Sequence, residues 1–183
     1  MSLEIERKFR IKIPSKAWLR SRENLSVTGL VQCYLTAREG WERRVRQATN
    51  ALTGEVRCTL TEKTEEAGLI RTELEKEISP SEYEALLGEM QPGTPPLYKV
   101  RWAFPFMGHT MEIDCYPFWE DEAILEVELS APDEMFFLPP EITVLEDVTD
   151  DPSLKNRALA LALADWERET MPGKIFDARQ IPY

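Results

Sequence analysis

The stretch LEIERKFRIKI, residues 3–13, alternates apolar and charged side chains along its whole length. Successive side chains of a β-strand point to opposite faces, so this pattern predicts a strand with one charged face and one face in an apolar core. Among the odd-numbered positions only Arg7 is charged. Pro14, which has no backbone N–H, ends the strand. The even-numbered positions carry Glu4, Glu6, Lys8, Arg10 and Lys12.

Seven more segments have strand character and are separated by turn-forming residues. Because no regular series of helices stands between them, eight strands favour an antiparallel meander or barrel over a parallel sheet. The seven segments are Gly29–Thr36, Glu42–Gln47, Glu55–Thr61, Leu69–Ile78, Tyr98–Phe106, Thr110–Tyr116 and Ala123–Leu129.

Three segments have helical character. A short helix is expected after Ser15, and a second begins at Pro80, where Ser79 and Glu82 have the spacing of a capping box. The third covers residues 152–169 and carries an apolar stripe. The sequence therefore predicts a mainly antiparallel β protein of the α+β class.

The composition limits the class of protein. The 183 residues contain 43% hydrophobic and 30% charged residues, which is typical of a globular chain. The 33 acidic residues outnumber the 22 basic ones and give a net charge of -11, which argues against a protein that coats nucleic acid. The charged first residues and the absence of a long apolar run predict a cytoplasmic protein with no membrane segment.

Acidic and basic residues are unevenly distributed along the chain. Residues 102–154 contain 14 acidic residues and no Lys or Arg. The rest of the chain holds all 22 basic residues against 19 acidic ones, a net charge of +3. This segregation suggests that the fold brings acidic and basic strands together.

Like charges also recur two residues apart within single strands, where they share a face. One interpretation is the solvated face of a half-buried sheet. Such a face usually mixes signs along a strand, whereas here the signs are sorted strand by strand. The doublets are Glu4/Glu6, Glu112/Asp114 and Glu126/Glu128 for the acids, and Arg44/Arg46 and Lys99/Arg101 for the bases.

We therefore expect an eight-stranded closed barrel with the charged face inward and the helices packed outside. Interior carboxylates and interior guanidinium groups compensate one another's loss of hydration only when they lie side by side. Clustered carboxylates with one histidine in the chain suit Mg²⁺ or Mn²⁺, and clustered Arg and Lys suit phosphate oxygens. Together they describe a metal-bridged polyphosphate site.

These motifs resemble the CYTH superfamily, the triphosphate tunnel metalloenzymes. Glu4-Ile5-Glu6-Arg7-Lys8 reads as the E-x-E-x-K signature of that family, and the family's other blocks follow in order from about residue 2 to 164. They are QCYL at 32–35, RVR at 44–46, LTEK at 60–63, RTELE at 71–75, KVR at 99–101, EID at 112–114, EVE at 126–128, DVT at 147–149 and KNRALA at 155–160.

The resemblance implies an eight-stranded tunnel domain over residues 1–164, followed by the end of a helix and an extended tail over residues 165–183. It implies catalytic roles for Lys8 and Tyr34. The implied metal ligands are Glu4, Glu6, Asp114, Glu126 and Glu128, with Glu73, Glu75 and Glu112 in support. The implied phosphate-binding residues are Lys8, Arg44, Arg46, Lys63, Arg71, Lys99 and Arg101.

The function that the resemblance implies is Mg²⁺- or Mn²⁺-dependent hydrolysis of a short linear triphosphate, either inorganic tripolyphosphate or a nucleoside or thiamine triphosphate. Two alternatives stay open at this point: a class IV adenylate cyclase that converts ATP to cyclic AMP, and a noncatalytic polyphosphate-binding module. The expected partner is a small-molecule triphosphate, with no nucleic acid and no membrane.

The sequence departs from the family pattern at two positions, Cys33 and Leu154, where a glycine and a tyrosine are common. The tail has no counterpart in the family. Three interpretations of it stay open: a cover over one end of the tunnel, a contact between the subunits of a homodimer, and a disordered segment.

Overall fold

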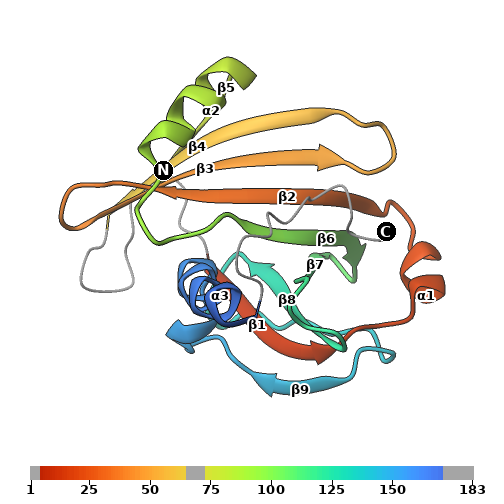
Figure 1. The fold of residues 1–183 in the computed structure, drawn as a ribbon. Helices are drawn as coiled ribbons and strands as arrows, with labels where there is room; N and C mark the ends of the chain where they lie inside the picture. Colours follow the sequence, from red (N-terminus) through yellow and green to blue (C-terminus); the bar gives the residue numbers. More distant parts are fainter. Residues whose placement is uncertain (1–4, 65–72, 171–183) are drawn as a thin grey trace.

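The structure is a computed structural model that describes residues 5–64 and 73–170. Within these residues, nine strands form one antiparallel sheet in the order β5-β4-β3-β2-β6-β7-β8-β1-β9 (Figure 1). The strands are β1 (Ile5–Lys12), β2 (Ser26–Leu35), β3 (Trp41–Asn50), β4 (Val56–Thr64), β5 (Glu73–Ile78), β6 (Leu97–Phe106), β7 (His109–Cys115), β8 (Glu122–Leu129) and β9 (Val144–Asp147). The helices are α1 (Lys16–Arg20), α2 (Pro80–Leu86) and α3 (Asn156–Thr170), with single 3₁₀ turns η1 (Leu87–Glu89) and η2 (Pro152–Leu154).

The eight strands expected from the sequence are present, although their ends differ by a few residues. Residues 69–72, the first part of one expected strand, lie outside the described residues. The antiparallel arrangement is also confirmed, since every strand pair of the described sheet is antiparallel.

The expectation of an eight-stranded closed barrel is wrong. Within the described residues, β5 pairs only with β4 at one end of the sheet, and β9 pairs only with β1 at the other. A closed sheet would have to pair its two end strands with each other. Here β9 occupies the second edge of β1, so the nine strands form an open sheet.

Strand β9 was not predicted because its sequence, VLED, has no alternation, and all four of its residues are exposed. It is held to β1 by the charged residue that interrupts the apolar face of that strand. Arg7 forms an ion pair with Asp147, and its Nε donates to Thr149 Oγ1 at 3.2 Å. The backbone N–H of Lys8 donates to the same hydroxyl at 3.1 Å. The charge at position 7 is therefore an edge contact rather than a defect in the core.

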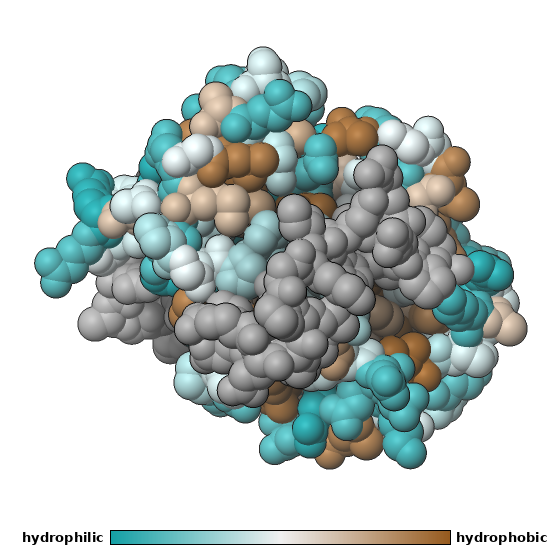
Figure 2. All heavy atoms as spheres, in the orientation of Figure 1, coloured by the Kyte–Doolittle hydropathy of each residue, from teal (hydrophilic) through white to brown (hydrophobic). Residues whose placement is uncertain are grey.

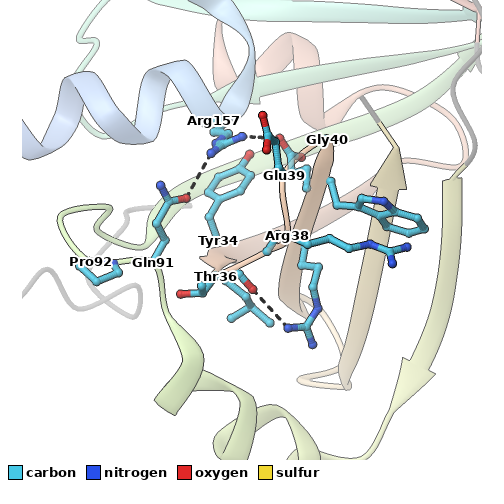
Figure 3. A pocket seen from close by; sticks show the side chains of 13 residues that line it. Tyr34, Thr36, Arg38, Glu39, Gly40, Gln91, Pro92 and Arg157 are labelled. Carbon is cyan, nitrogen blue, oxygen red and sulfur yellow. Dashed lines mark hydrogen bonds and ion pairs between the residues drawn. The ribbon is translucent and has the colours of Figure 1, made fainter. Parts of the chain in front are cut away.

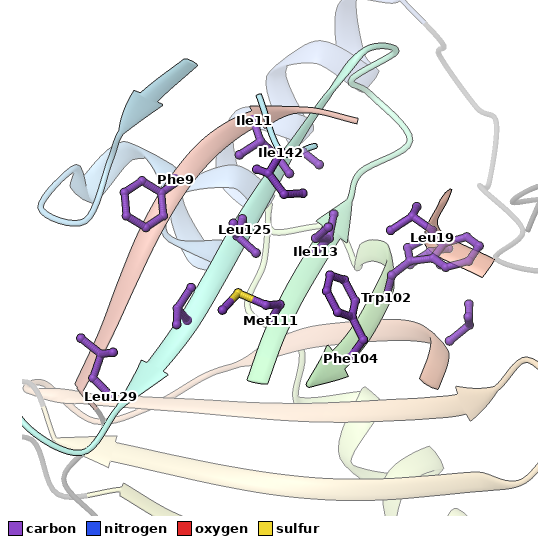
Figure 4. Packing of buried hydrophobic residues seen from close by; sticks show 14 residues of the cluster. Phe9, Ile11, Leu19, Trp102, Phe104, Met111, Ile113, Leu125, Leu129 and Ile142 are labelled. Carbon is purple, nitrogen blue, oxygen red and sulfur yellow. The ribbon is translucent and has the colours of Figure 1, made fainter. Parts of the chain in front are cut away.

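The apolar face of the sheet is covered in two places. One cluster joins β1, β6, β7 and β8 to Leu19 of α1 and to Ile142 of the segment before β9 (Figure 4). The second cluster joins β2, β3, β4 and β5 to Tyr83 of α2. Helix α2 starts as expected, because Ser79 and Glu82 form the complete capping box. These two clusters form most of the core and leave the opposite face to the charged side chains.

Helix α3 lies on that opposite face, within the curve of the sheet (Figure 1). Its Leu159, Ala160 and Leu163 pack against Tyr34 of β2 and Ile124 of β8, which share a face with the charged residues. The expectation that all helices pack on the outside is therefore wrong for α3. Of the apolar stripe expected on this helix, Leu163 is buried but Leu161 is exposed, and Leu159 and Ala160 are buried instead. The sequence also does not tell which side of the sheet the helix covers.

Hydrophilic side chains dominate the described part of the surface in Figure 2, with apolar side chains scattered among them. Exposed large apolar residues come from separate segments, for example Leu52, Leu74 and Met135. Across residues 5–64 and 73–170, no helix has the length and hydrophobicity that crossing a bilayer requires.

Candidate functional site

Strand register places the sorted charges on one face of the sheet, which we call the charged face. Across β1, β8, β7 and β6 the opposed pairs are Glu6 with Glu128, Lys8 with Glu126, Glu126 with Glu112, and Asp114 with Arg101. Across β2, β3, β4 and β5 they are Gln32 with Arg46, Tyr34 with Arg44, Arg44 with Thr61, Arg46 with Thr59, and Thr61 with Glu75.

An unbroken chain of ion pairs joins β1 to β6 on this face. Lys8 Nζ lies 3.0 Å from Glu6 Oε1 and 2.9 Å from Glu126 Oε1. The other carboxylate oxygen of Glu126 accepts from Arg101 Nη2 at 2.7 Å. Arg101 also contacts Glu112 and binds both oxygens of Asp114. The structure therefore brings together Lys8, Arg101 and four of the predicted acidic residues, Glu6, Glu112, Asp114 and Glu126.

Asp114 is the most buried carboxylate in this chain of contacts, with 0% of its surface exposed. Lys99, exposed by only 1%, also forms an ion pair with it. Burial acts to raise the pKa of Asp114, but Lys99 and Arg101 outweigh burial and hold that pKa well below its usual range. Asp114 therefore stays ionised and fixes the two cations beside it.

Lys8 has a related environment. Burial acts to lower its pKa, but Glu126 and Glu6 outweigh burial and hold the pKa above the ordinary value for lysine. Lys8 therefore carries a positive charge between two carboxylates.

The acidic side of the face suits a hard divalent cation. Glu6 stands opposite Glu128, and Glu112 stands opposite Glu126; like charges in such pairs repel unless a cation lies between them. Burial raises the pKa of Glu112, as do the nearby Asp114, Glu126 and Glu128, although Arg101 opposes the rise. All these donors are carboxylate oxygens, which Mg²⁺ and Mn²⁺ prefer. The residues present therefore fit such an ion.

The carboxylates are not arranged as a ready metal site. Among the described residues, no three Asp, Glu, His or Cys side chains lie together in a geometry that could hold a metal ion. Glu6 and Glu126 contact Lys8, while Glu112 and Asp114 contact Arg101. Glu4, the first residue of the predicted ligand set, lies outside the described residues.

The basic side of the face lies on β3 and β4. Arg44 is buried on β3, and Lys63 on β4 stands opposite Glu42. Burial lowers the pKa of Arg46, and the positive charges of Arg44 and Arg101 lower it further, against the opposing effects of Glu75 and Asp114. Arg44, Arg46 and Lys63 place three basic side chains on two neighbouring strands, a composition that suits an anion.

The structure describes the three predicted site residues Glu75, Glu73 and Arg71 to different extents. Glu75 accepts a hydrogen bond from Thr61 Oγ1 at 2.8 Å, and its charge also acts on Arg46. The backbone of Glu73 in β5 pairs with Lys63 in β4, and the side chain of Glu73 is outside the described part. Arg71 lies entirely outside the described residues.

Tyr34 lies on the basic side and is only 2% exposed. The amide nitrogen of Gln32 donates to its hydroxyl oxygen at 2.5 Å, so the hydroxyl hydrogen is directed elsewhere. Burial raises the pKa of Tyr34 far above its ordinary value, and Glu42 raises it further, against the nearby arginines. Tyr34 is therefore a proton-bearing hydrogen-bond donor at neutral pH. Lys8 and Tyr34 have separate contacts in the described structure, four strands apart in the sheet order.

The start of α3 adds polar residues that had no predicted role. Asn156 Oδ1 accepts from Tyr116 Oη at 2.8 Å and from Lys99 Nζ at 3.4 Å. Arg157 Nη2 donates to Gln91 Oε1 at 3.3 Å, and its Nη1 lies 4.0 Å from Glu42 Oε2. Gln32 and Asn156 are neutral, so the charge pattern that marked the other site residues gave no signal for them.

A cavity of about 360 Å³ opens beside Tyr34, between the loop that joins β2 to β3 and the start of α3 (Figure 3). Arg38 lies over the ring of Trp41, with its guanidinium carbon 3.9 Å from the ring centre. Arg157 and Gln91 line the same cavity. The charged face therefore continues into an open, partly aromatic cavity at this end of β2 and β3.

Comparison with solved structures gives relatives over most of the chain. The inorganic triphosphatase NE1496 is 29% identical with a TM-score of 0.58, and the match covers 88% of this chain and 96% of that chain. A second crystal structure, of the hypothetical protein NE1496, is 30% identical with a TM-score of 0.56, covering 86% of this chain and 97% of that chain. The protein PH1819 from Pyrococcus horikoshii OT3 is 17% identical with a TM-score of 0.48, covering 68% of this chain and 78% of that chain. No family profile matches the sequence, and no curated protein does.

Proposed function

The chain belongs to the CYTH superfamily, and on that premise we propose that it hydrolyses a short linear triphosphate with the help of a divalent metal ion. The similar protein NE1496 is an inorganic triphosphatase, so inorganic tripolyphosphate is the leading substrate. The nucleoside and thiamine triphosphates are the other candidates.

The observation that carries the proposal is the division of the charged face into an acidic and a basic side. A triphosphate needs cations around its nonbridging oxygens, and the phosphoanhydride bond breaks faster when charge on the leaving oxygen is neutralised. Carboxylates and arginines on neighbouring strands supply a metal-binding side and a phosphate-binding side in one continuous face.

In this proposal Glu6, Glu126 and Glu128 hold the metal together with Glu4, and Asp114 keeps its neighbouring cations in place. The bound ion would polarise phosphoryl oxygens and orient the attacking water. Lys8 bridges Glu6 and Glu126, and its positive charge offsets the repulsion between them. Glu112 supports this arrangement through its contact with Arg101.

Arg44, Arg46 and Lys63 on the basic side hold the phosphates together with Lys99 and Arg101 of β6, with Arg71 as a further candidate. Arginine suits this role because its planar guanidinium can bind two oxygens of one phosphate. Tyr34 donates its hydroxyl hydrogen to a phosphoryl oxygen, which its contact with Gln32 favours.

The proposal is tested by measuring phosphate release from tripolyphosphate, pyrophosphate, ATP and thiamine triphosphate with Mg²⁺ or Mn²⁺. We expect release from at least one triphosphate and no release with EDTA. No release from any of them would refute the hydrolase. With ATP, cyclic AMP and pyrophosphate as products would indicate a cyclase instead, and tight binding without turnover would indicate a binding module.

A matched pair of variants locates the activity. Arg44→Ala should lower kcat/KM by about tenfold or more, because it removes a charged contact to phosphate. Arg57→Ala removes the same charge from the neighbouring strand β4, where Arg57 is exposed and bonded to Glu55. It should leave the rate unchanged.

A further inference from the structure

Three adjacent side chains on the charged face each carry a buried polar atom with no hydrogen-bond partner in the described structure. The atoms are Gln32 Oε1, Arg46 Nε and Thr59 Oγ1. The residues belong to three neighbouring strands and stand directly opposite one another: Gln32 faces Arg46 across β2 and β3, and Arg46 faces Thr59 across β3 and β4. They form one row across the sheet, which we call the Gln32 row.

Such a row is costly unless a ligand completes it. Most buried polar groups in folded proteins have a partner, and leaving one without a partner destabilises the protein. Gln32 is only 1% exposed, so bulk water does not solvate it freely. Three adjacent buried atoms without partners therefore destabilise the free protein. A ligand that forms hydrogen bonds to them would remove this destabilisation.

The chemistry of the row indicates the group. Arg46 Nε and Thr59 Oγ1 are hydrogen-bond donors that suit one phosphoryl oxygen. Gln32 Oε1 is an amide oxygen and can only accept a hydrogen bond, so it suits a water molecule that also donates to that phosphoryl group. Arg44 and Arg101 add positive charge near Arg46, and Glu75 and Asp114 add negative charge there.

We propose that the Gln32 row is a subsite for one phosphoryl group of a polyphosphate, in which Arg46 and Thr59 bind an oxygen and Gln32 holds a water molecule against it. The inference rests on the proposed function for its substrate class. It adds Gln32 and Thr59 to the binding residues and gives each a specific contact.

The test separates a ligand contact from a structural one by pairing affinity with stability. Thr59→Val keeps the shape of the side chain and removes only the hydroxyl. Binding of inorganic tripolyphosphate, measured by calorimetry in EDTA to prevent turnover, should weaken by about tenfold, the loss expected for one hydrogen bond to a charged group. The melting temperature without ligand should stay the same or rise, because an unpartnered buried hydroxyl has been removed.

Gln32→Leu should weaken binding similarly, although it also removes the donor to Tyr34. Matched controls come from the opposite face of β3, where Gln47→Leu and Thr49→Val should leave the affinity unchanged. Three results would each overturn the subsite. Thr59→Val could bind tripolyphosphate as tightly as the wild type, or its weaker binding could come with a lower melting temperature. The third is that the wild type does not bind tripolyphosphate at all. Binding as expected without turnover under any metal would refute the hydrolase and leave the subsite standing.

Discussion

Arg101 holds both carboxylate oxygens of Asp114, with Nε to Oδ1 and Nη2 to Oδ2 at 2.7 Å each. Lys99 contacts the same carboxylate from the next position of its face on β6. One buried acid thus fixes two cations that face the proposed phosphate site. Asp114 is therefore needed for the stability of the fold, because the buried cations Lys99 and Arg101 require a negative partner.

Asp114→Ala should therefore destabilise the fold strongly. Removing one member of a buried ion pair typically costs about 3–5 kcal/mol, since the remaining charges are left without compensation. Urea unfolding followed by tryptophan fluorescence measures the loss. Glu55→Ala, which breaks the exposed pair with Arg57, is the control and should change stability by less than about 1 kcal/mol. Equal effects of the two substitutions would contradict the structural role of Asp114.

The contacts of Asp147, which hold β9 to β1, should make the stability of the fold depend on pH. Burial acts to raise the pKa of Asp147, but hydrogen bonds from Thr149 and the contact with Arg7 outweigh burial and lower it. A lowered pKa in the folded state contributes stability that is present above the unfolded-state pKa and is lost as pH falls through the folded value. Wild type should thus be more stable than Asp147→Asn at neutral pH, and the difference should shrink below about pH 4. Urea unfolding at several pH values tests this, and a difference that grows toward acid pH would contradict it.

The strands and the sorting of charge were predictable because both follow from local alternation. Residues 3–13 show this best, because alternation defines both faces of β1. The one exception, Arg7, is explained by its ion pair with Asp147, which lies about 140 residues away in the sequence. Nothing local in VLED identifies β9 as a strand, because an exposed edge strand needs no apolar alternation.

Whether the sheet closes into a barrel could not be predicted from the sequence for a related reason. It depends on which strand takes the free edge of β1, and that choice is made by contacts between distant segments. The side of the sheet that α3 covers was unpredictable for the same reason. An apolar stripe shows which face of a helix is buried, but not which surface that face packs against. Of the candidate site, the charged residues were found from their pattern. The neutral residues Gln32, Thr59 and Asn156 were given no role by that pattern, and only their neighbours in the structure suggest one.

Substitution of a proposed metal ligand should change the Mg²⁺ requirement of the reaction without weakening the binding of tripolyphosphate. Glu6→Gln and Glu128→Gln remove charge from opposed positions on β1 and β8. Each should raise the Mg²⁺ concentration needed for half-maximal activity by about tenfold or more. Affinity for tripolyphosphate in EDTA should stay the same or increase, because a negative charge near the site is gone. Glu84→Gln on the exposed surface of α2 is the control. Unchanged metal dependence in both variants would place the metal elsewhere.

The hydroxyl of Tyr34 should act on the rate rather than on substrate affinity. Tyr34→Phe removes a buried donor whose oxygen is held by Gln32, and one preorganised donor to a developing charge contributes about 100-fold or more to kcat. KM for the preferred triphosphate should change much less, because the arginines supply most of the ground-state attraction. Steady-state kinetics of Tyr34→Phe are compared with those of Tyr98→Phe, which lies on the opposite face of β6. If Tyr34→Phe raises KM at an unchanged kcat, the hydroxyl binds substrate without assisting the reaction, and its proposed catalytic role is lost.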